Sequence, residues 1–219
     1  MRPVDKGVHP LNVDGTSVVF HAYADAAPYL RERLGRYCSY CERKIPTNLA
    51  VEHVMSKCHM PALEKVWENF LLACINCNSH KGSQLVQLDD CLWPDRDDTF
   101  AALTYEPSGA IKVAMGLDPL QQAKARALLS LVGLDTTPEQ ASAADYRHKD
   151  RLEQWGKAKV AFDLLQRTSA QSLEKTRTAI ITLATDGYSI WATVFRADPL
   201  MLNALVQKYP GTKGGCASA

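Results

Sequence analysis

Long apolar runs are missing from this sequence. No stretch approaches the roughly 18 consecutive apolar residues of a membrane span, and residues 1–6 lack the apolar core of a secretory signal. We therefore expect a cytoplasmic protein that does not enter a membrane. Because the cytoplasm keeps thiols reduced, the seven cysteines indicate metal binding or free thiols rather than a disulfide framework.

A strong net charge is missing too. The formal net charge of +1 and the pI near 7.6 are weak for a protein that must hold nucleic acid alone, because phosphate contacts supply much of that affinity. A nucleic-acid surface must therefore be local, or be supplied by a partner. Internal repeats and low-complexity tracts are also absent, whereas 46% hydrophobic residues in a chain of 219 allow a sizeable core.

The N-terminal part is predicted to be an arm and a helix, residues 1–36. Glycine and proline interrupt short apolar pieces, which indicates an irregular arm with a short strand around residues 17–20. Apolar residues then recur at helical spacing over 25–34, and Gly35 is placed to end this helix.

The rest of the chain completes a predicted α+β, mainly helical fold. Residues 37–115 are predicted to form a module of strand, short helical insert near 63–66, strand and helix, followed by two strands within 103–113 that a Pro-Ser-Gly turn joins. Residues 116–210 have helical periodicity and are predicted to form a C-terminal helical domain, and residues 211–219 a flexible tail. The predicted helices are residues 120–131, 144–166, 172–185, 191–196 and 200–209.

Four cysteines form two C-x-x-C pairs, Cys38 with Cys41 and Cys74 with Cys77. Two intervening residues let both thiolates of a pair reach one ion from a tight turn, so two pairs complete a tetrahedral zinc site. A site closed by four thiolates is structural, because catalysis needs an open coordination position. The remaining cysteines lack partners at ligand spacing and are expected to be ordinary thiols: Cys58, Cys91 and Cys216.

The segment between the pairs carries Glu52-His53, then Asn69, and the second pair is followed by Asn78-Ser79-His80-Lys81-Gly82. In this spacing the sequence resembles the HNH endonucleases. Their motif runs Asp/Glu-His, a central Asn that opens a strand ending in C-x-x-C, and a final Asn or His followed by Lys-Gly. The resemblance implies a ββα-metal module that cleaves phosphodiester bonds.

The candidate catalytic residues are Glu52, His53, Asn69 and Asn78. An imidazole with an ordinary pKa of about 6.5 can take a proton from water at neutral pH, which makes His53 the expected general base. The resemblance implies that Asn69 orients His53 through an amide hydrogen bond, and that Glu52 and Asn78 bind the catalytic ion. An ion held by only two oxygen ligands keeps coordination positions open for phosphate and water, and this arrangement suits Mg²⁺ or Mn²⁺ better than zinc.

Each of these residues has an ordinary interpretation when taken singly. A histidine beside a glutamate is usually a surface pair, and an asparagine before a helix is usually an N-cap. Lys81 is expected to meet substrate phosphate or solvent, and His80 to be a further ligand, a phosphate contact or an exposed side chain. Trp67 is expected to pack in the core rather than to stack on a base.

Further segments resemble one group of HNH proteins, the PtuB type of Septu antiphage systems, which also occurs as effectors linked to some retrons. The resemblance covers residues 1–115, carried by residues 1–7, 37–43, 67–81 and 93–95. It implies a partner ATPase of the ABC or SMC-like type, called PtuA, that controls the nuclease. DNA is the expected substrate. RNA, such as tRNA in a retron-linked system, is the alternative, because no residue of the motif distinguishes ribose from deoxyribose.

A different class of function remains open as well. In it the protein is a zinc-stabilised adaptor whose HNH residues are silent and whose helical domain docks a partner. An apolar cluster near the C-terminus, Trp191, Val194, Phe195, Leu200 and Leu205, is interpreted as core rather than as such an interface. A set of basic residues is interpreted as a solvated helix face rather than a nucleic-acid patch: Arg147, Lys149, Arg151, Lys157 and Lys159.

Overall fold

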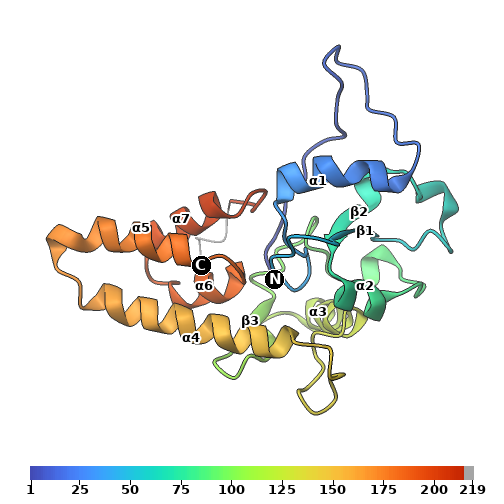
Figure 1. Ribbon diagram of the computed structural model, residues 1–219. Helices are drawn as coiled ribbons and strands as arrows, with labels where there is room; N and C mark the ends of the chain where they lie inside the picture. The colour runs from blue at the N-terminus through green and yellow to red at the C-terminus, as the bar shows by residue number, and fades with distance from the viewer. Residues whose placement is uncertain (215–219) are drawn as a thin grey trace.

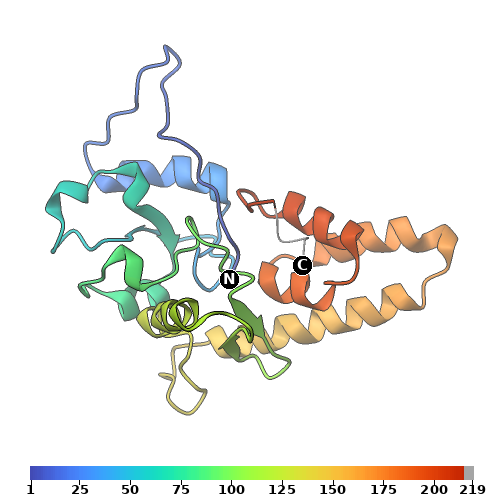
Figure 2. The same ribbon diagram turned by 180° about the vertical axis from the view of Figure 1, so that it is seen from behind.

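A computed structural model describes residues 1–214 of the chain. Helices α1, α2 and α3 and strands β1 and β2 gather on one side of the molecule, helices α4 to α7 lie on the other, and β3 lies at the junction (Figures 1 and 2). We call these two parts the α1–α3 lobe and the α4–α7 lobe. Within residues 1–214, no helix is both long and apolar enough to cross a membrane.

The first antiparallel sheet pairs β1 (Ala50–His53) with β2 (Phe70–Ala73), so that His53 lies opposite Phe70. All four β2 residues are buried, because α1 (Ala27–Leu34) and the rest of the lobe cover the sheet. Helix α2 (Ile75–Lys81) follows β2 directly. The predicted order of strand, insert, strand and helix is confirmed. Single 3₁₀ turns lie before α1 and inside the insert: η1 (Tyr23–Ala26), η2 (Pro61–Leu63) and η3 (Trp67–Asn69).

The N-terminal arm differs from its prediction. Residues 17–20 do not form a strand; Ser17 makes only an isolated bridge with Leu11, which closes an exposed loop. The arm is held at its base, where Trp67 is 1% exposed and its indole donates a hydrogen bond to the carbonyl of Gly7 at 2.9 Å. Trp67 is thus a packing residue, as predicted.

The end of the described chain is tied to its beginning. The amide of Asp5 donates to the carbonyl of Gly211, and the amide of Lys213 donates to the carbonyl of Pro3. The buried guanidinium of Arg2 donates to the carbonyl of Pro210 at 2.6 Å. Residues 211–213 are therefore held by hydrogen bonds to the N-terminal segment, which differs from the flexible tail predicted from residue 211. Residues 215–219 lie outside the described part.

A second antiparallel sheet pairs β3 (Leu103–Tyr105) with β4 (Ile111–Val113), as the Pro-Ser-Gly turn predicts. Helix α3 (Pro119–Leu131) is capped at its N-terminus by Asp118, whose carboxylate accepts a hydrogen bond from the amide of Gln121. It contacts β4 and the short turn η4 (Leu88–Asp90). Helix α3 thus packs with the α1–α3 lobe, although its sequence belongs to the helical stretch predicted from residue 116.

The α4–α7 lobe consists of α4 (Arg147–Gln166), a 3₁₀ turn η5 (Ala170–Ser172), α5 (Leu173–Leu183), α6 (Tyr188–Val194) and α7 (Pro199–Lys208). The predicted helices are confirmed within a few residues at each end. The core of this lobe contains Trp191, Phe195 and Leu205, which are fully buried. Leu200, placed in the same cluster from the sequence, is 61% exposed.

Two charged residues of α4 are buried at the junction, against the prediction of a solvated face. Arg147 and Arg151 are 2% and 6% exposed. Arg147 donates to the carbonyls of Val132 at 2.6 Å and Gly133 at 2.9 Å, and Arg151 to the carbonyl of Gly109 at 2.6 Å. These three carbonyls do not accept hydrogen bonds within a helix or sheet, so the two guanidiniums supply their donors. The same bonds join the two lobes.

Candidate active site and metal centre

The four-cysteine cluster lies between the first sheet and α4. Cys38 and Cys41 lie in the turn that follows α1, and Cys74 and Cys77 at the start of α2. All four are buried, and their sulfur atoms lie within 4.8 Å of one another. A tetrahedral zinc site with bonds of about 2.3 Å needs sulfur atoms about 3.8 Å apart. The cluster therefore fits a metal ion, and its donor set suits zinc.

Two arginines face this cluster from different segments. The guanidinium of Arg43 approaches Cys74 Sγ at 3.7 Å, and that of Arg147 approaches Cys77 Sγ at 3.2 Å. Four thiolates around a divalent ion would carry a net charge of −2, which two cations neutralise inside the protein, where unpaired charge is costly. The arrangement fits a buried metal thiolate centre better than four neutral thiols.

The other described cysteines are separate from the cluster. Cys91 is buried, and burial together with the nearby Asp90 raises the pKa of its thiol to about 11. Cys58 is exposed, in the loop after β1. Cys216 lies outside the described residues.

Beside the cluster lies a cavity of about 230 Å³, which we call the β1–α2 pocket. It brings together Glu52 and His53 from β1 with Asn78 and Lys81 from α2, so four residues selected from the sequence meet at one place. Neither Asn69 nor His80 is among its lining residues. The remaining lining residues are Tyr23, Val51, Ser56, Lys57, Cys58, Gly82 and Ser83.

The ring of His53 is fixed in one orientation. Its Nε2 lies 2.9 Å from the carbonyl oxygen of Glu64, and its faces are bordered by Tyr23 and Phe70 in edge-on contacts. Because a carbonyl only accepts hydrogen bonds, Nε2 carries the proton and the lone pair of the neutral ring is on Nδ1. Burial lowers the pKa of His53, so the ring is neutral at neutral pH and its Nδ1 lone pair can accept a proton.

Asn69 acts elsewhere than the sequence predicts. Its Oδ1 accepts from the amide of Met55 at 2.7 Å, and its Nδ2 donates to the carbonyls of Met55 and Leu63. These three bonds hold the loop between β1 and β2, in which Leu63 is followed directly by Glu64. The expected amide bond to His53 is replaced by the carbonyl of Glu64, and Asn69 orients His53 only through this loop.

Lys81 is the clearest departure from the predicted site. It is 1% exposed, and its ammonium lies 2.8 Å from Glu52 Oε1 and donates to the carbonyl of His53 at 2.7 Å. It is thus neither in solvent nor placed to meet a phosphate directly. Glu52 is 4% exposed; burial raises the pKa of its carboxyl group, and Lys81 opposes this effect.

The pocket also contains oxygen atoms that can bind a metal ion. Glu52 Oε1 is buried and, although Lys81 is close, has no hydrogen bond of acceptable geometry within residues 1–214. In the same part of the chain, the side chain of Asn78 has no hydrogen-bond partner. A carboxylate and an amide oxygen in a pocket open to water fit Mg²⁺ or Mn²⁺, which prefer oxygen ligands.

His80 faces away from this pocket. Its Nε2 is 4.0 Å from Asp145 Oδ2, its side chain is 44% exposed, and its ring lies against Gly133. Lys57, which the sequence did not single out, is instead a cation on the pocket wall, with its ammonium 4.4 Å from the centre of the Tyr23 ring. The sequence around Lys57 has no periodic pattern from which the direction of its side chain could be predicted. Only the folded structure places Lys57 on the pocket wall.

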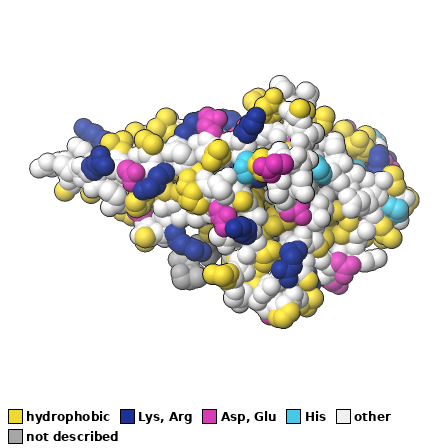
Figure 3. Space-filling model, turned by 90° about the horizontal axis from the view of Figure 1, so that it is seen from below, with side chains coloured by type: hydrophobic (Ala, Val, Ile, Leu, Met, Phe, Trp, Pro, Cys, Tyr) yellow, Lys and Arg dark blue, Asp and Glu magenta, His cyan; other side chains and the backbone are white. Residues whose placement is uncertain are grey.

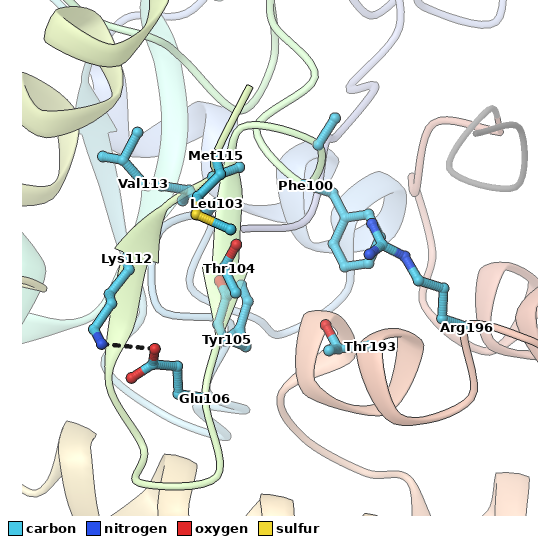
Figure 4. A pocket seen from close by; sticks show the side chains of 12 residues that line it. Phe100, Leu103, Thr104, Tyr105, Glu106, Lys112, Val113, Met115, Thr193 and Arg196 are labelled. Atoms are coloured by element: carbon cyan, nitrogen blue, oxygen red, sulfur yellow. Dashed lines mark ion pairs between the residues drawn. The ribbon is translucent and has the colours of Figure 1, made fainter. Parts of the chain in front are cut away.

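A second cavity, of about 530 Å³, lies between the β3–β4 hairpin and α6. Figure 4 shows Lys112 and Glu106 paired along the hairpin side, and Thr193 and Arg196 on the helix side. It contains no histidine or cysteine, and its one carboxylate is held by Lys112. The candidate residues Glu52, His53 and Asn78 therefore line the β1–α2 pocket and not this second cavity.

A comparison with protein families covers the same part of the chain. Residues 38–84 match the family model of the HNH endonuclease. The match begins at the first cysteine of the cluster and includes β1, β2, α2 and every residue of the β1–α2 pocket except Tyr23. No curated protein matches the sequence. This part of the chain is therefore similar to an HNH endonuclease domain, which suggests a nuclease.

Proposed function

We propose that this protein is a metal-dependent endonuclease with His53 as its general base and with Glu52 and Asn78 as protein ligands of Mg²⁺ or Mn²⁺. One observation carries the proposal: these three side chains meet in one pocket, inside the HNH match and beside a four-cysteine cluster that would hold zinc. The cysteines give the domain its shape, and the pocket performs the chemistry.

The reaction would be hydrolysis of a phosphodiester bond. His53 Nδ1 takes a proton from a water molecule whose oxygen attacks phosphorus, while the bond from phosphorus to the 3′ oxygen breaks. The leaving 3′ oxygen takes a proton from solvent, and His53 later returns its proton to solvent. The products carry a 5′ phosphate and a 3′ hydroxyl. The bound divalent ion would polarise the scissile phosphate and stabilise the leaving oxygen. Glu64 holds the ring so that Nδ1 is free to act.

DNA is the proposed substrate, and Lys57 is the proposed phosphate contact on the pocket wall. Lys57 takes the role that the sequence suggested for Lys81, because its side chain is 42% exposed. RNA, including tRNA, is the alternative, since the pocket contains no group placed to distinguish the sugars.

The test is cleavage by the purified chain with Mg²⁺ or Mn²⁺, on supercoiled plasmid and on tRNA in parallel. The variant His53→Ala should lose at least about 100-fold in rate, since general-base catalysis contributes that much or more, and should keep its zinc and its melting temperature. His148→Ala is the matched control: it removes an imidazole from α4, where the ring packs against Gly109. Full activity of His53→Ala would remove His53 from the mechanism.

We further propose that the nuclease acts in antiphage defence together with an ABC or SMC-like ATPase. The resemblance of residues 1–115 to PtuB-type proteins supports this, as does the near-neutral charge. In Figure 3 acidic, basic and apolar side chains are intermixed over the narrow part of the molecule that contains α4, without a continuous basic surface.

Co-purification tests this partnership. The proposal predicts a neighbouring gene for an ABC or SMC-like ATPase; the chain should form a complex with that ATPase and cleave more rapidly in the complex than alone. A retron-linked system predicts a neighbouring reverse transcriptase and cleavage of tRNA. If neither the chain nor its complex cleaves any nucleic acid, while zinc and partner binding persist, the adaptor function replaces the nuclease proposal.

A further inference from the structure

Lys81 is unusual because a lysine ammonium is almost never buried without a reason. It ends α2, where Gly82 adopts φ +52° and donates its amide to the carbonyl of Asn78. The side chain turns back into the protein and reaches the end of β1. There its two partners are Glu52 Oε1 and the backbone of His53, the first of which is a proposed metal ligand.

The pair has a direct effect on the charge of the pocket. Glu52 supplies the negative charge among the proposed ligands, since Asn78 is neutral, and Lys81 cancels it at 2.8 Å. A divalent ion entering the β1–α2 pocket would therefore meet two oxygen atoms without net negative charge, and a buried like charge beside them. Charges this close interact strongly where water is partly excluded.

We propose that Lys81 is a positioning residue that holds Glu52 at the pocket and, by neutralising it, keeps the affinity of the free protein for a divalent ion low until nucleic-acid phosphates add negative charge. This inference rests on the proposed nuclease function and concerns the same pocket. Metal and nucleic acid then bind with positive coupling, and by thermodynamic linkage each raises the affinity for the other to the same extent.

A purely structural ion pair predicts something different. If Lys81 only stabilised the fold, its removal would lower the melting temperature and leave the metal affinity unchanged or weakened. If Lys81 opposes the ion, its removal strengthens metal binding even where it weakens the fold. Metal affinity therefore separates the two roles, and it can be measured without cleavage.

The experiment is titration of the full-length, zinc-loaded protein with Mn²⁺, followed by electron paramagnetic resonance of the free ion. Lys81→Met and Lys81→Gln both remove the charge, and the glutamine retains a donor for the carbonyl of His53. We expect at least about tenfold tighter Mn²⁺ binding in either variant, because one nearby unit charge is worth that much or more. An unchanged or weaker affinity in a folded variant would overturn the proposal.

Lys57→Met is the matched control. Lys57 lines the same pocket, but its ammonium pairs with Glu64 and not with Glu52. This control should change Mn²⁺ affinity by much less than the Lys81 variants. Equal effects would show that Lys81 has no special relation to Glu52, and would also overturn the proposal.

A measurement that keeps Lys81 in place covers the case in which neither variant folds. With His53→Ala, which prevents cleavage, Mn²⁺ affinity is measured with and without a short DNA duplex. Binding at least about tenfold tighter with the duplex supports the coupling, and equal affinity overturns it. Tighter Mn²⁺ binding in the Lys81 variants, with no cleavage by either the natural chain or its complex with the ATPase, would retain this inference and refute the nuclease. Cleavage with unaltered Mn²⁺ affinity in the Lys81 variants would do the reverse.

Discussion

Arg147 on α4 donates a hydrogen bond to Cys77 of the four-cysteine cluster, with 3.2 Å between Nη1 and Sγ. The same guanidinium holds the carbonyls of Val132 and Gly133. One buried side chain thus connects the helical lobe, the chain that follows α3 and the proposed zinc centre. The second arginine at the cluster, Arg43, reaches α4 as well, through an ion pair with Asp150 at 3.0 Å.

Replacing Arg147 should weaken both the fold and zinc retention. Arg147→Met leaves two buried carbonyls and a thiolate without their donor, so we expect a loss of about 3 kcal/mol in the free energy of unfolding, typical for one partner of a buried charged group. Zinc should also be released to a chelator more rapidly. Urea unfolding and a colorimetric zinc assay measure the two effects. Lys149→Met, two residues away and exposed, is the control; equal losses in the two variants would contradict the role of Arg147.

Gly133 should not tolerate alanine, for two separable reasons. Its φ is +62°, and a Cβ atom there would lie 2.5 Å from His80 Nδ1. We expect Gly133→Ala to cost about 2 kcal/mol, about half of it backbone strain. His80→Ala in the same chain should remove the steric part, which a double-mutant cycle of urea midpoints measures.

The strain alone is measured by Gly116→Ala, because Gly116 has φ +89° and open space around it. If the cost of Gly133→Ala were the same with and without His80, the ring would not lie where the structure places it.

Asp186 should make the protein less stable at neutral pH than in mild acid. Burial raises the pKa of its carboxyl group to about 6, although the amide of Lys44 donates to it, and the unfolded value is 3.8. The folded state therefore holds this proton more tightly, and its stability falls as the pH rises from about 4 to about 6 and stays reduced above.

Asp186→Asn should consequently stabilise the protein by about 2 kcal/mol at pH 7, and by almost nothing below pH 4. Denaturation at a series of pH values measures this difference. A gain for Asp186→Asn that is independent of pH would refute the raised pKa.

Lys57 should contribute to nucleic-acid binding rather than to the chemical step. Lys57→Ala should weaken binding of DNA similarly for all sequences and reduce the slope of log affinity against log salt by about one, as expected for one phosphate contact. Its ion pair with Glu64 is exposed and worth little, so folding should not change. Lys65→Ala, next to Glu64 but outside the pocket lining, is the control, and an equal loss there would indicate a diffuse charge effect.

The sequence by itself determined the local chemistry. Two C-x-x-C pairs predict a cluster that can hold a metal ion, because their spacing is a property of short turns. Asp118 and the Pro-Ser-Gly turn place a helix and a hairpin through hydrogen bonds to near neighbours. Periodicity likewise located the helices of the C-terminal half. The meeting of Glu52, His53 and Asn78 also followed from spacing, through the resemblance to a known motif.

Only the tertiary structure decided which polar side chains face water and which face each other. Lys81 is buried and Lys57 lines the pocket, although both are lysines in polar segments; Asn69 holds a loop, and the carbonyl of Glu64 holds His53. Arg147 reaches the cysteine cluster from 70 residues away. These contacts join segments whose approach depends on the packing of the whole core, and no local pattern of residues encodes that approach.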